Sequence, residues 1–165
     1  MKIISIANQK GGCGKTTTAI NLSAGLAYKG RQVLLIDMDP QGHSSMGLNI
    51  MPGDSEKTIY DALYGADGKK AALDEVIVQI SDGFELVPSN IRLSVLEQQL
   101  SMVPGRENKL KEAIDELYQN YDYILIDCPP SLGLLTFNSL MASDEVIIPI
   151  DMGFFSLNGT TLLSR

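Results

Sequence analysis

The sequence predicts an α/β fold in which helices flank a mostly parallel central sheet. A short apolar run at residues 3–7 precedes a glycine-rich loop and a segment with helical spacing. Two later apolar runs, 33–36 and 121–127, both lead into an aspartate, and further helix-like segments lie between them. A helix between two strands carries the chain back to the end of the sheet where the first strand began. Neighbouring strands are therefore expected to run parallel.

Length and composition indicate one globular domain. The 165 residues are 44% hydrophobic and 20% charged, which is ordinary for a soluble protein with a substantial core. A membrane-spanning helix needs about 18 consecutive apolar residues, and no run in this sequence approaches that length. No signal peptide is expected. The net charge of −7 argues against this segment alone coating nucleic acid. Cys13 and Cys128 lack metal-binding spacing, so free thiols in a reducing cytosol are expected.

The loop after the first strand has the composition of a phosphate cradle. Its glycines let the backbone curl around an anion, and the following helix presents unpaired amides at its N-terminus. Lys15 supplies a charge for terminal phosphates, and Thr16 supplies a hydroxyl for Mg²⁺. The pattern G-x-x-x-x-G-K-[ST] is broken by Gln9, and Lys10 is an additional lysine. The alternative is a glycine-rich turn with two solvated lysines.

A second candidate segment follows the next strand. The helix ends at Lys29-Gly30, and the apolar run 33–36 has the character of a strand buried on both faces. It leads into Asp37 and Asp39, two carboxylates two residues apart at a strand end, where open α/β sheets bind ligands. The alternative is an ordinary turn rich in Asp, Pro and Gly.

The middle of the chain is expected to build the rest of the core. Residues 43–57 are predicted as a loop, and the only histidine, His43, is expected near the nucleotide at most. Thr58 is expected to cap a short helix. The remaining predictions are helices at 59–64, 71–76, 91–100 and 107–118, an extended segment at 76–78 and a strand at 83–88. The leucine stripes of the last two helices are expected to face the core.

A third strand end carries a further carboxylate. The apolar run 121–127 ends in Asp127, as a Mg²⁺-associated Walker B strand requires, and two prolines then take the chain out of the sheet. After it we predict a helix at 132–141, another buried strand at 145–150 and a helix beginning at 156–163.

Three stretches together resemble the ParA/Soj partitioning ATPases, members of the deviant-Walker P-loop class that includes MinD and the nitrogenase iron protein. They are Lys10-Gly11-Gly12-Cys13-Gly14-Lys15-Thr16-Thr17, Leu35-Ile36-Asp37-Met38-Asp39-Pro40-Gln41-Gly42 and Ile126-Asp127-Cys128-Pro129-Pro130-Ser131-Leu132-Gly133. The resemblance implies a P-loop NTPase fold and a single ATPase domain over residues 1–165. Family members usually run on well past this length, so it also implies a domain that is incomplete at its C-terminal end.

The resemblance assigns a role to each motif residue. It implies that Lys15 contacts the β- and γ-phosphates of ATP and that Thr17 contacts the α-phosphate. It implies Mg²⁺ ligation by Thr16, with Asp37 and Asp127 around the metal. The whole stretch Lys10, Gly11, Gly12, Cys13, Gly14, Lys15, Thr16 and Thr17 is then the nucleotide-binding loop.

The same resemblance implies a slow switch. Lys10 corresponds to the signature lysine that crosses to the nucleotide of a partner subunit, so ATP joins a homodimer. Asp39 corresponds to the residue that orients the attacking water, a role that suits a carboxylate too weakly basic to be a strong general base at neutral pH. Lys10, Lys15 and Asp39 are thus the predicted catalytic residues.

The biological role implied is partitioning of a chromosome or plasmid. The resemblance implies a cytoplasmic, nucleoid-associated protein without membrane attachment, a stimulating ParB-like partner, and nonspecific DNA binding through residues not present in this chain. One alternative is a MinD-like positioning ATPase on the membrane, although no C-terminal amphipathic helix is visible. The other is a nucleotide-binding module without turnover.

Overall fold

A six-stranded sheet in the order β3-β4-β2-β5-β1-β6 forms the centre of the molecule. The computed structural model describes residues 1–51, 53–65 and 68–150. The strands are β1 (Lys2–Ile6), β2 (Val33–Asp37), β3 (Val78–Ser81), β4 (Phe84–Val87), β5 (Tyr123–Asp127) and β6 (Glu145–Ile147). All neighbouring pairs are parallel except β3 and β4. The predicted α/β fold with a mostly parallel sheet is confirmed.

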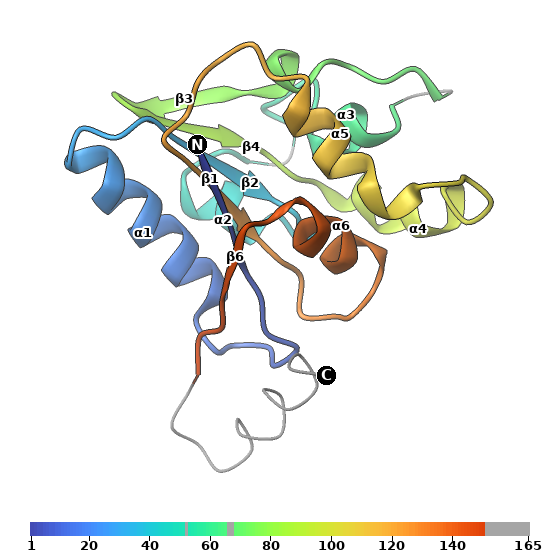
Figure 1. Ribbon diagram of the computed structural model, residues 1–165, viewed down its shortest axis with the longest axis horizontal. Coiled ribbons are helices and arrows are strands. Elements are labelled where there is room, and N and C mark those ends of the chain that lie inside the picture. The colour runs from blue at the N-terminus through green and yellow to red at the C-terminus, as the bar shows by residue number, and fades with distance from the viewer. Residues whose placement is uncertain (52, 66–67, 151–165) are drawn as a thin grey trace.

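Helices cover both faces of this sheet (Figure 1). The helix α1 (Lys15–Tyr28) packs on one face. The other face is covered by α3 (Ile59–Leu63), α4 (Leu96–Gln99), α5 (Lys109–Asp115) and α6 (Leu134–Ala142). Short 3₁₀ turns lie at η2 (Leu73–Val76), η3 (Ile91–Val95) and η4 (Arg106–Asn108). One more helix, α2 (His43–Gly47), follows the loop after β2.

Alternation along the strands divides the core into two layers. Leu34 and Ile36 belong to the cluster that packs with α3–α6, whereas Val33 and Leu35 belong to the cluster on the α1 side. All four side chains are fully buried, as expected of a strand covered on both faces. The predicted core-facing stripes are confirmed too, since Leu93, Leu96, Leu100, Leu110, Ala113 and Ile114 all lie in the first cluster.

The structure corrects the extent or type of the elements predicted at 43–57, 91–100 and 107–118. Residues 43–57 are not all loop, because His43–Gly47 forms α2. The helix predicted at 91–100 divides into η3 and α4, and the one predicted at 107–118 continues η4 as α5 and stops at Asp115. Thr58 is the N-cap of α3, as predicted, and its backbone amide donates to Asp61 Oδ2 at 2.9 Å. The helix predicted at 156–163 lies outside the described residues.

The strand predicted as buried at 145–150 is short and partly exposed. Only Glu145–Ile147 is a strand, and Val146 is 43% exposed. In the described part of the chain β6 pairs with β1 alone and has no neighbour on its other side. The apolar sequence therefore predicted a strand correctly but predicted its burial wrongly. None of the described helices is long and apolar enough to span a membrane.

Candidate functional site

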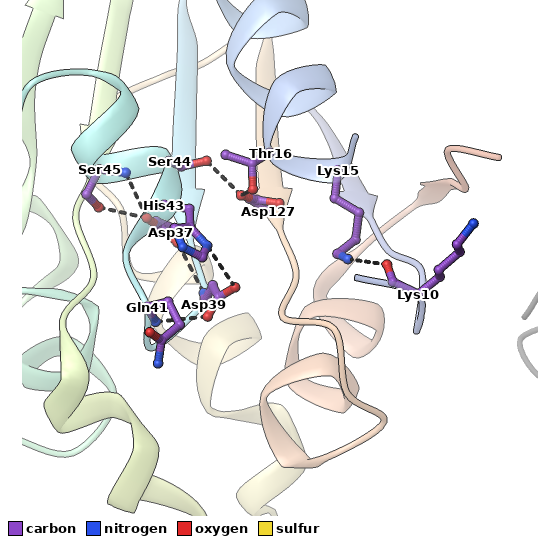
Figure 2. A network of polar contacts seen from close by, with 10 residues as sticks. All are labelled: Lys10, Lys15, Thr16, Asp37, Asp39, Gln41, His43, Ser44, Ser45 and Asp127. Atoms are coloured by element: carbon purple, nitrogen blue, oxygen red, sulfur yellow. Dashed lines mark hydrogen bonds and ion pairs between the residues drawn. The ribbon is translucent and has the colours of Figure 1, made fainter. Parts of the chain in front are cut away.

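The predicted site residues meet at the carboxyl ends of three parallel strands. In the strand register, Asp127 of β5 lies opposite Ile6 of β1 and opposite Asp37 of β2. The glycine-rich loop begins where β1 ends, so the loop and both aspartates share one edge of the sheet. Figure 2 shows the result, with Thr16 and Asp127 between the two lysines and the segment that carries Asp39.

A cavity of about 420 Å³ opens at this edge. It is lined by Gly11, Gly12, Gly14, Lys15, Thr16, Thr17, Asp39, Gln41, His43 and Pro130. The structure thus brings together most of the predicted nucleotide-binding residues and the predicted water-orienting aspartate. Lys10, Cys13, Asp37 and Asp127 are not among the lining residues. Of these, Cys13 turns its thiol inward, where Sγ donates to the backbone oxygen of Lys10 at 3.1 Å.

The loop has the backbone of an anion cradle. Gly12 and Gly14 adopt left-handed φ values of 72° and 88°, and Gly14 caps the N-terminus of α1. A Cβ added at either position would meet no atom within 4 Å, so the backbone faces open space. The first amides of α1 point out of the helix end without intrahelical acceptors, which favours a negatively charged ligand.

Lys15 stands at the first position of α1 and is only 7% exposed. Its Nζ donates to the backbone oxygen of Lys10 at 3.0 Å, an interaction that folds the side chain back along the loop. The ammonium is therefore held inside the cradle, where a terminal phosphate group would compete with a single carbonyl for it.

Asp127 has the geometry of a carboxylate prepared for a cation. Its Oδ2 accepts hydrogen bonds from Thr16 Oγ1 at 2.8 Å and from Ser44 Oγ at 2.7 Å. Its Oδ1 is buried and has no hydrogen-bond partner in the described part of the chain. Burial raises the pKa of this carboxyl, against the lowering effect of the Ser44 and Thr16 hydroxyls. An unpaired buried oxygen is costly, so a metal ion or its bound water fits here.

Asp37 lies beside Asp127 but has its acceptors filled. Its Oδ2 accepts from Ser45 N and Ser45 Oγ, both at 2.8 Å, and its Oδ1 accepts from Asp39 N at 3.1 Å. Burial nevertheless raises its pKa to about 7, because desolvation outweighs these bonds. The predicted role of Asp37 near Mg²⁺ stays a prediction, and the visible role of its carboxylate is to anchor the start of α2.

Asp39 faces the cavity from the loop after β2. Its Oδ1 accepts from Gln41 N at 2.9 Å, and its Oδ2 lies 3.8 Å from His43 Nδ1. The backbone therefore fixes one carboxylate oxygen, while the other faces an exposed imidazole across the cavity wall. His43, expected near the nucleotide at most, is one of the residues that line the cavity.

Lys10 is oriented differently from Lys15. Its backbone amide donates to Asn8 Oδ1 at 3.0 Å, which shapes the start of the loop. In Figure 2 the Lys10 side chain extends away from Lys15 and Asp39. The structure therefore does not bring the Lys10 ammonium to the cavity that its own chain forms.

The donor set suits Mg²⁺ with a nucleotide better than a metal held by protein alone. No group of three or more His, Cys, Asp or Glu side chains able to hold a metal occurs among the residues that the structure describes. One hydroxyl at Thr16, one carboxylate at Asp127 and an open phosphate cradle are what Mg²⁺ uses when phosphates and waters complete its shell.

Sequence reasoning missed two serines that organise the site. Ser44 and Ser45 lie in the segment predicted as loop, yet both are buried and bind the Asp127 and Asp37 carboxylates. Their only sequence signal is position, since they follow Asp37 and Asp39 closely in the chain. The fold then returns α2 to the strand ends.

Comparison with known proteins identifies the family. A protein-family description, AAA domain, matches residues 1–165. The sporulation initiation inhibitor protein Soj of Bacillus subtilis is 48% identical over 163 residues, covering 98% of this chain and 63% of that protein. The chromosome partitioning protein ParA of Caulobacter vibrioides is 43% identical over 167 residues, covering 100% of this chain and 61% of that protein. The chain belongs to the ParA/Soj family. It spans less than two thirds of the length of either relative.

Solved structures agree with this ParA/Soj assignment. Cobyrinic acid a,c-diamide synthase from Mycobacterium smegmatis, with bound ADP and magnesium, superposes with a TM-score of 0.93 at 38% identity, covering 100% of this chain and 66% of that one. A plasmid partition protein from Borrelia burgdorferi, bound to AMPPNP, gives 0.87 at 33% identity, covering 99% and 66%. The predicted P-loop NTPase fold and the predicted ParA/Soj resemblance are both confirmed.

Proposed function

We propose that this chain is the nucleotide-binding part of a ParA/Soj-type switch that binds ATP with Mg²⁺ and hydrolyses it. The observation that carries the proposal is one cavity lined by Lys15, Thr16 and Asp39, with the unpaired oxygen of Asp127 beside Thr16. Related structures with ADP and magnesium or with AMPPNP support the choice of ligand. The same domain, residues 1–165, supplies all of these groups.

The residues divide the work of phosphoryl transfer. The loop amides and Lys15 bind the phosphate chain, with Thr17 at the α-phosphate, while Thr16 and Asp127 hold the metal. Bound Mg²⁺ would neutralise charge on the β- and γ-phosphate oxygens. Asp39 orients the attacking water through the carboxylate oxygen not bound to Gln41 N. Because phosphoryl transfer depends mainly on positioning and charge, a water-holding carboxylate without a strong base gives slow turnover.

Lys10 makes hydrolysis depend on a second subunit. Its side chain points away from its own cavity, which suits a lysine that reaches the nucleotide of a partner chain in an ATP-joined homodimer. A charge supplied by a neighbour stabilises the transition state only after association, as an arginine finger does. Nucleotide state would then set subunit association.

At the level of the whole protein, the proposal is partitioning of a chromosome or plasmid. It includes nonspecific DNA binding through residues beyond this chain, stimulation by a ParB-like partner, and a cytoplasmic, nucleoid-associated location. The names of the relatives from Caulobacter vibrioides and Borrelia burgdorferi support this role.

Binding and turnover are separable by two substitutions. Lys15→Ala should abolish binding of a fluorescent ATP analogue, because the cradle loses its buried cation. Asp39→Ala should retain binding and lower phosphate release by at least about 100-fold, the size of effect expected when a reacting group loses its positioning. Lys29→Ala, an exposed lysine at the end of α1, is the matched control and should change neither.

Two results would overturn the assignment. Normal phosphate release by Asp39→Ala would remove its water-orienting role. Binding without measurable release by the unaltered chain, with or without DNA, would instead favour a nucleotide-binding module without turnover. The trans role of Lys10 is tested by light scattering after gel filtration with ATP. Lys10→Ala should stay monomeric, and an ATP-dependent dimer of that variant would refute the role.

A further inference from the structure

Two consecutive serines of α2 each bind the aspartate at the end of a different strand. Ser44 Oγ donates to Asp127 Oδ2 at 2.7 Å, and Ser45 Oγ donates to Asp37 Oδ2 at 2.8 Å. Asp37 and Asp127 are register partners on the adjacent strands β2 and β5. Neighbouring residues of a helix point about 100° apart, so one short helix reaches both carboxylates at once. Figure 2 shows both contacts.

The two carboxylate oxygens of Asp127 differ in the number of hydrogen bonds that they accept. Oδ2 accepts from Thr16 of α1 and from Ser44 of α2, whereas the buried Oδ1 has no partner among the described residues. Two donors from separate elements fix the rotation of the carboxylate about its Cβ–Cγ bond. Without Ser44, the hydrogen bonds that the described residues donate to the Asp127 carboxylate would be reduced to the one from Thr16, which is itself the predicted Mg²⁺ ligand.

Ser44 is held rigidly enough for this task. Its side chain is 0% exposed, and the next residue, Ser45, is tied to a third strand end because Ser45 Oγ accepts from Ser89 N at 3.0 Å. The turn into α2 uses Gly42 at a φ of 64°, with Ser89 O only 3.2 Å from where a Cβ would stand. Hydrogen bonds of Ser44 and Ser45 therefore tie α2 to the ends of β5 and β2 and to the segment that follows β4.

We propose that Ser44 is a positioning residue that orients the Asp127 carboxylate toward the divalent cation of the bound nucleotide. This role rests on the proposed function, because it needs a nucleotide-bound cation beside Thr16. Groups that hydrogen-bond a metal-associated carboxylate typically change metal affinity or activity about 10- to 100-fold when removed. Ser44 thus acts on the cation through Asp127, without touching substrate.

A purely structural Ser44 makes a different prediction. If the hydroxyl only stabilised α2, its loss would weaken nucleotide binding equally with and without Mg²⁺. If Ser44 positions Asp127, its removal should lower only the part of the nucleotide affinity that depends on Mg²⁺. The ratio of ATP-analogue affinity in Mg²⁺ to that in EDTA therefore separates the two, and it needs no turnover.

The test compares the unaltered chain with Ser44→Ala and Ser23→Ala. Ser23 is a matched control, because it is equally buried and its hydroxyl has no hydrogen-bond partner among the described residues. For Ser44→Ala we expect the Mg²⁺-to-EDTA affinity ratio to fall about ten-fold, with the EDTA affinity unchanged. Mn²⁺ titration of the ATP complex, followed by electron paramagnetic resonance, should show a similar weakening. Ser23→Ala should match the unaltered chain in both assays.

Each outcome decides something. If the unaltered chain binds no ATP analogue, the proposed function fails. If the unaltered chain binds with a clear Mg²⁺ dependence and Ser44→Ala keeps the same ratio, the positioning role alone fails. Should Ser44→Ala not fold, as judged by circular dichroism, Ser44→Cys replaces it. Its thiol has a similar shape but is a weaker donor, so the same ratio should fall by a smaller factor, and an unchanged ratio would overturn the proposal.

Discussion

Replacing Asp37 with asparagine tests whether burial or hydrogen bonding controls the ionisation of the carboxyl at the end of β2. The Asp37 side chain is fully buried, and its two oxygens accept three bonds from Ser45 and the Asp39 amide. Those bonds favour the ionised form, whereas desolvation opposes it. Desolvation is the larger effect, and it raises the pKa of Asp37 from 3.8 to about 7. Asparagine keeps the shape and removes the titration.

The sign of the pH effect follows from proton counting. Well below the ordinary pKa of 3.8, both folded and unfolded chains hold the Asp37 proton. As the pH rises toward 7, the unfolded chain releases it while the folded chain retains it, so the folded state loses stability. At about 1.4 kcal/mol per pKa unit, the loss approaches roughly 4 kcal/mol by neutral pH, as an upper bound.

Urea unfolding at several pH values, in EDTA and without nucleotide, measures this loss. Asp37→Asn should begin less stable by about 1–3 kcal/mol, since its amide group places a donor against a backbone or hydroxyl donor. The stability deficit of the variant relative to the unaltered chain should then shrink as the pH rises from about 4 to about 7, because only the unaltered chain loses stability from Asp37. Taking the difference between the two proteins removes the contributions of titrating groups that do not interact with Asp37.

Asp122→Asn is the matched control. Asp122 also accepts a backbone hydrogen bond, from Gln32 N at 2.9 Å, but it is exposed. Its difference from the unaltered chain should stay within about 0.5 kcal/mol across the range. If Asp37→Asn instead falls further behind as the pH rises, the three hydrogen bonds outweigh burial and the reasoning is refuted.

Two further substitutions test how the site segment and the core are held. Gly42→Ala should lower the free energy of unfolding by about 1–2 kcal/mol in urea, because a φ of 64° is strained for a residue with a Cβ and Ser89 O lies close. An unchanged midpoint would show that the turn relaxes. Thr58→Ala should cost about 1 kcal/mol, read as a lower Tm, because α3 loses its N-cap hydroxyl, which donates to the Asp61 carboxylate. A Tm equal to that of the unaltered chain would mean that packing alone holds α3.

The parts of the site that could be predicted are those in which local pattern and sheet topology agree. The glycine loop was recognisable because strand, glycines, lysine and helix follow one another within a few residues. Asp39 and Asp127 were recognisable because each follows an apolar run, and parallel strands bring such ends to one edge. In each case the short-range signal was sufficient, and the fold had only to bring the strand ends together.

The helix α2 could not be predicted, for a physical reason. His43–Gly47 has no apolar period, and two serines and a glycine are weak helix formers. It forms because Ser44 and Ser45 find acceptors on Asp127 and Asp37, contacts that exist only after β2 and β5 have paired. The division of the segment 91–100 into η3 and α4 has a similar origin, since Asn90 binds Arg92 N and sets a tighter first turn.

The two strand-end aspartates show most clearly what the fold adds. Asp37 and Asp127 have the same local pattern and stand opposite each other, so both were predicted to lie around Mg²⁺. Burial raises the pKa of both, and a serine of α2 binds each. Only Asp127 retains an oxygen without a partner in the described chain, while every oxygen of Asp37 is engaged. A cation entering beside Thr16 would relieve an unsatisfied group at Asp127 but would have to displace existing bonds at Asp37. This difference supports the proposed position of the cation beside Asp127, whereas the carboxylate of Asp37 binds Ser45 of the helix whose Ser44 binds Asp127.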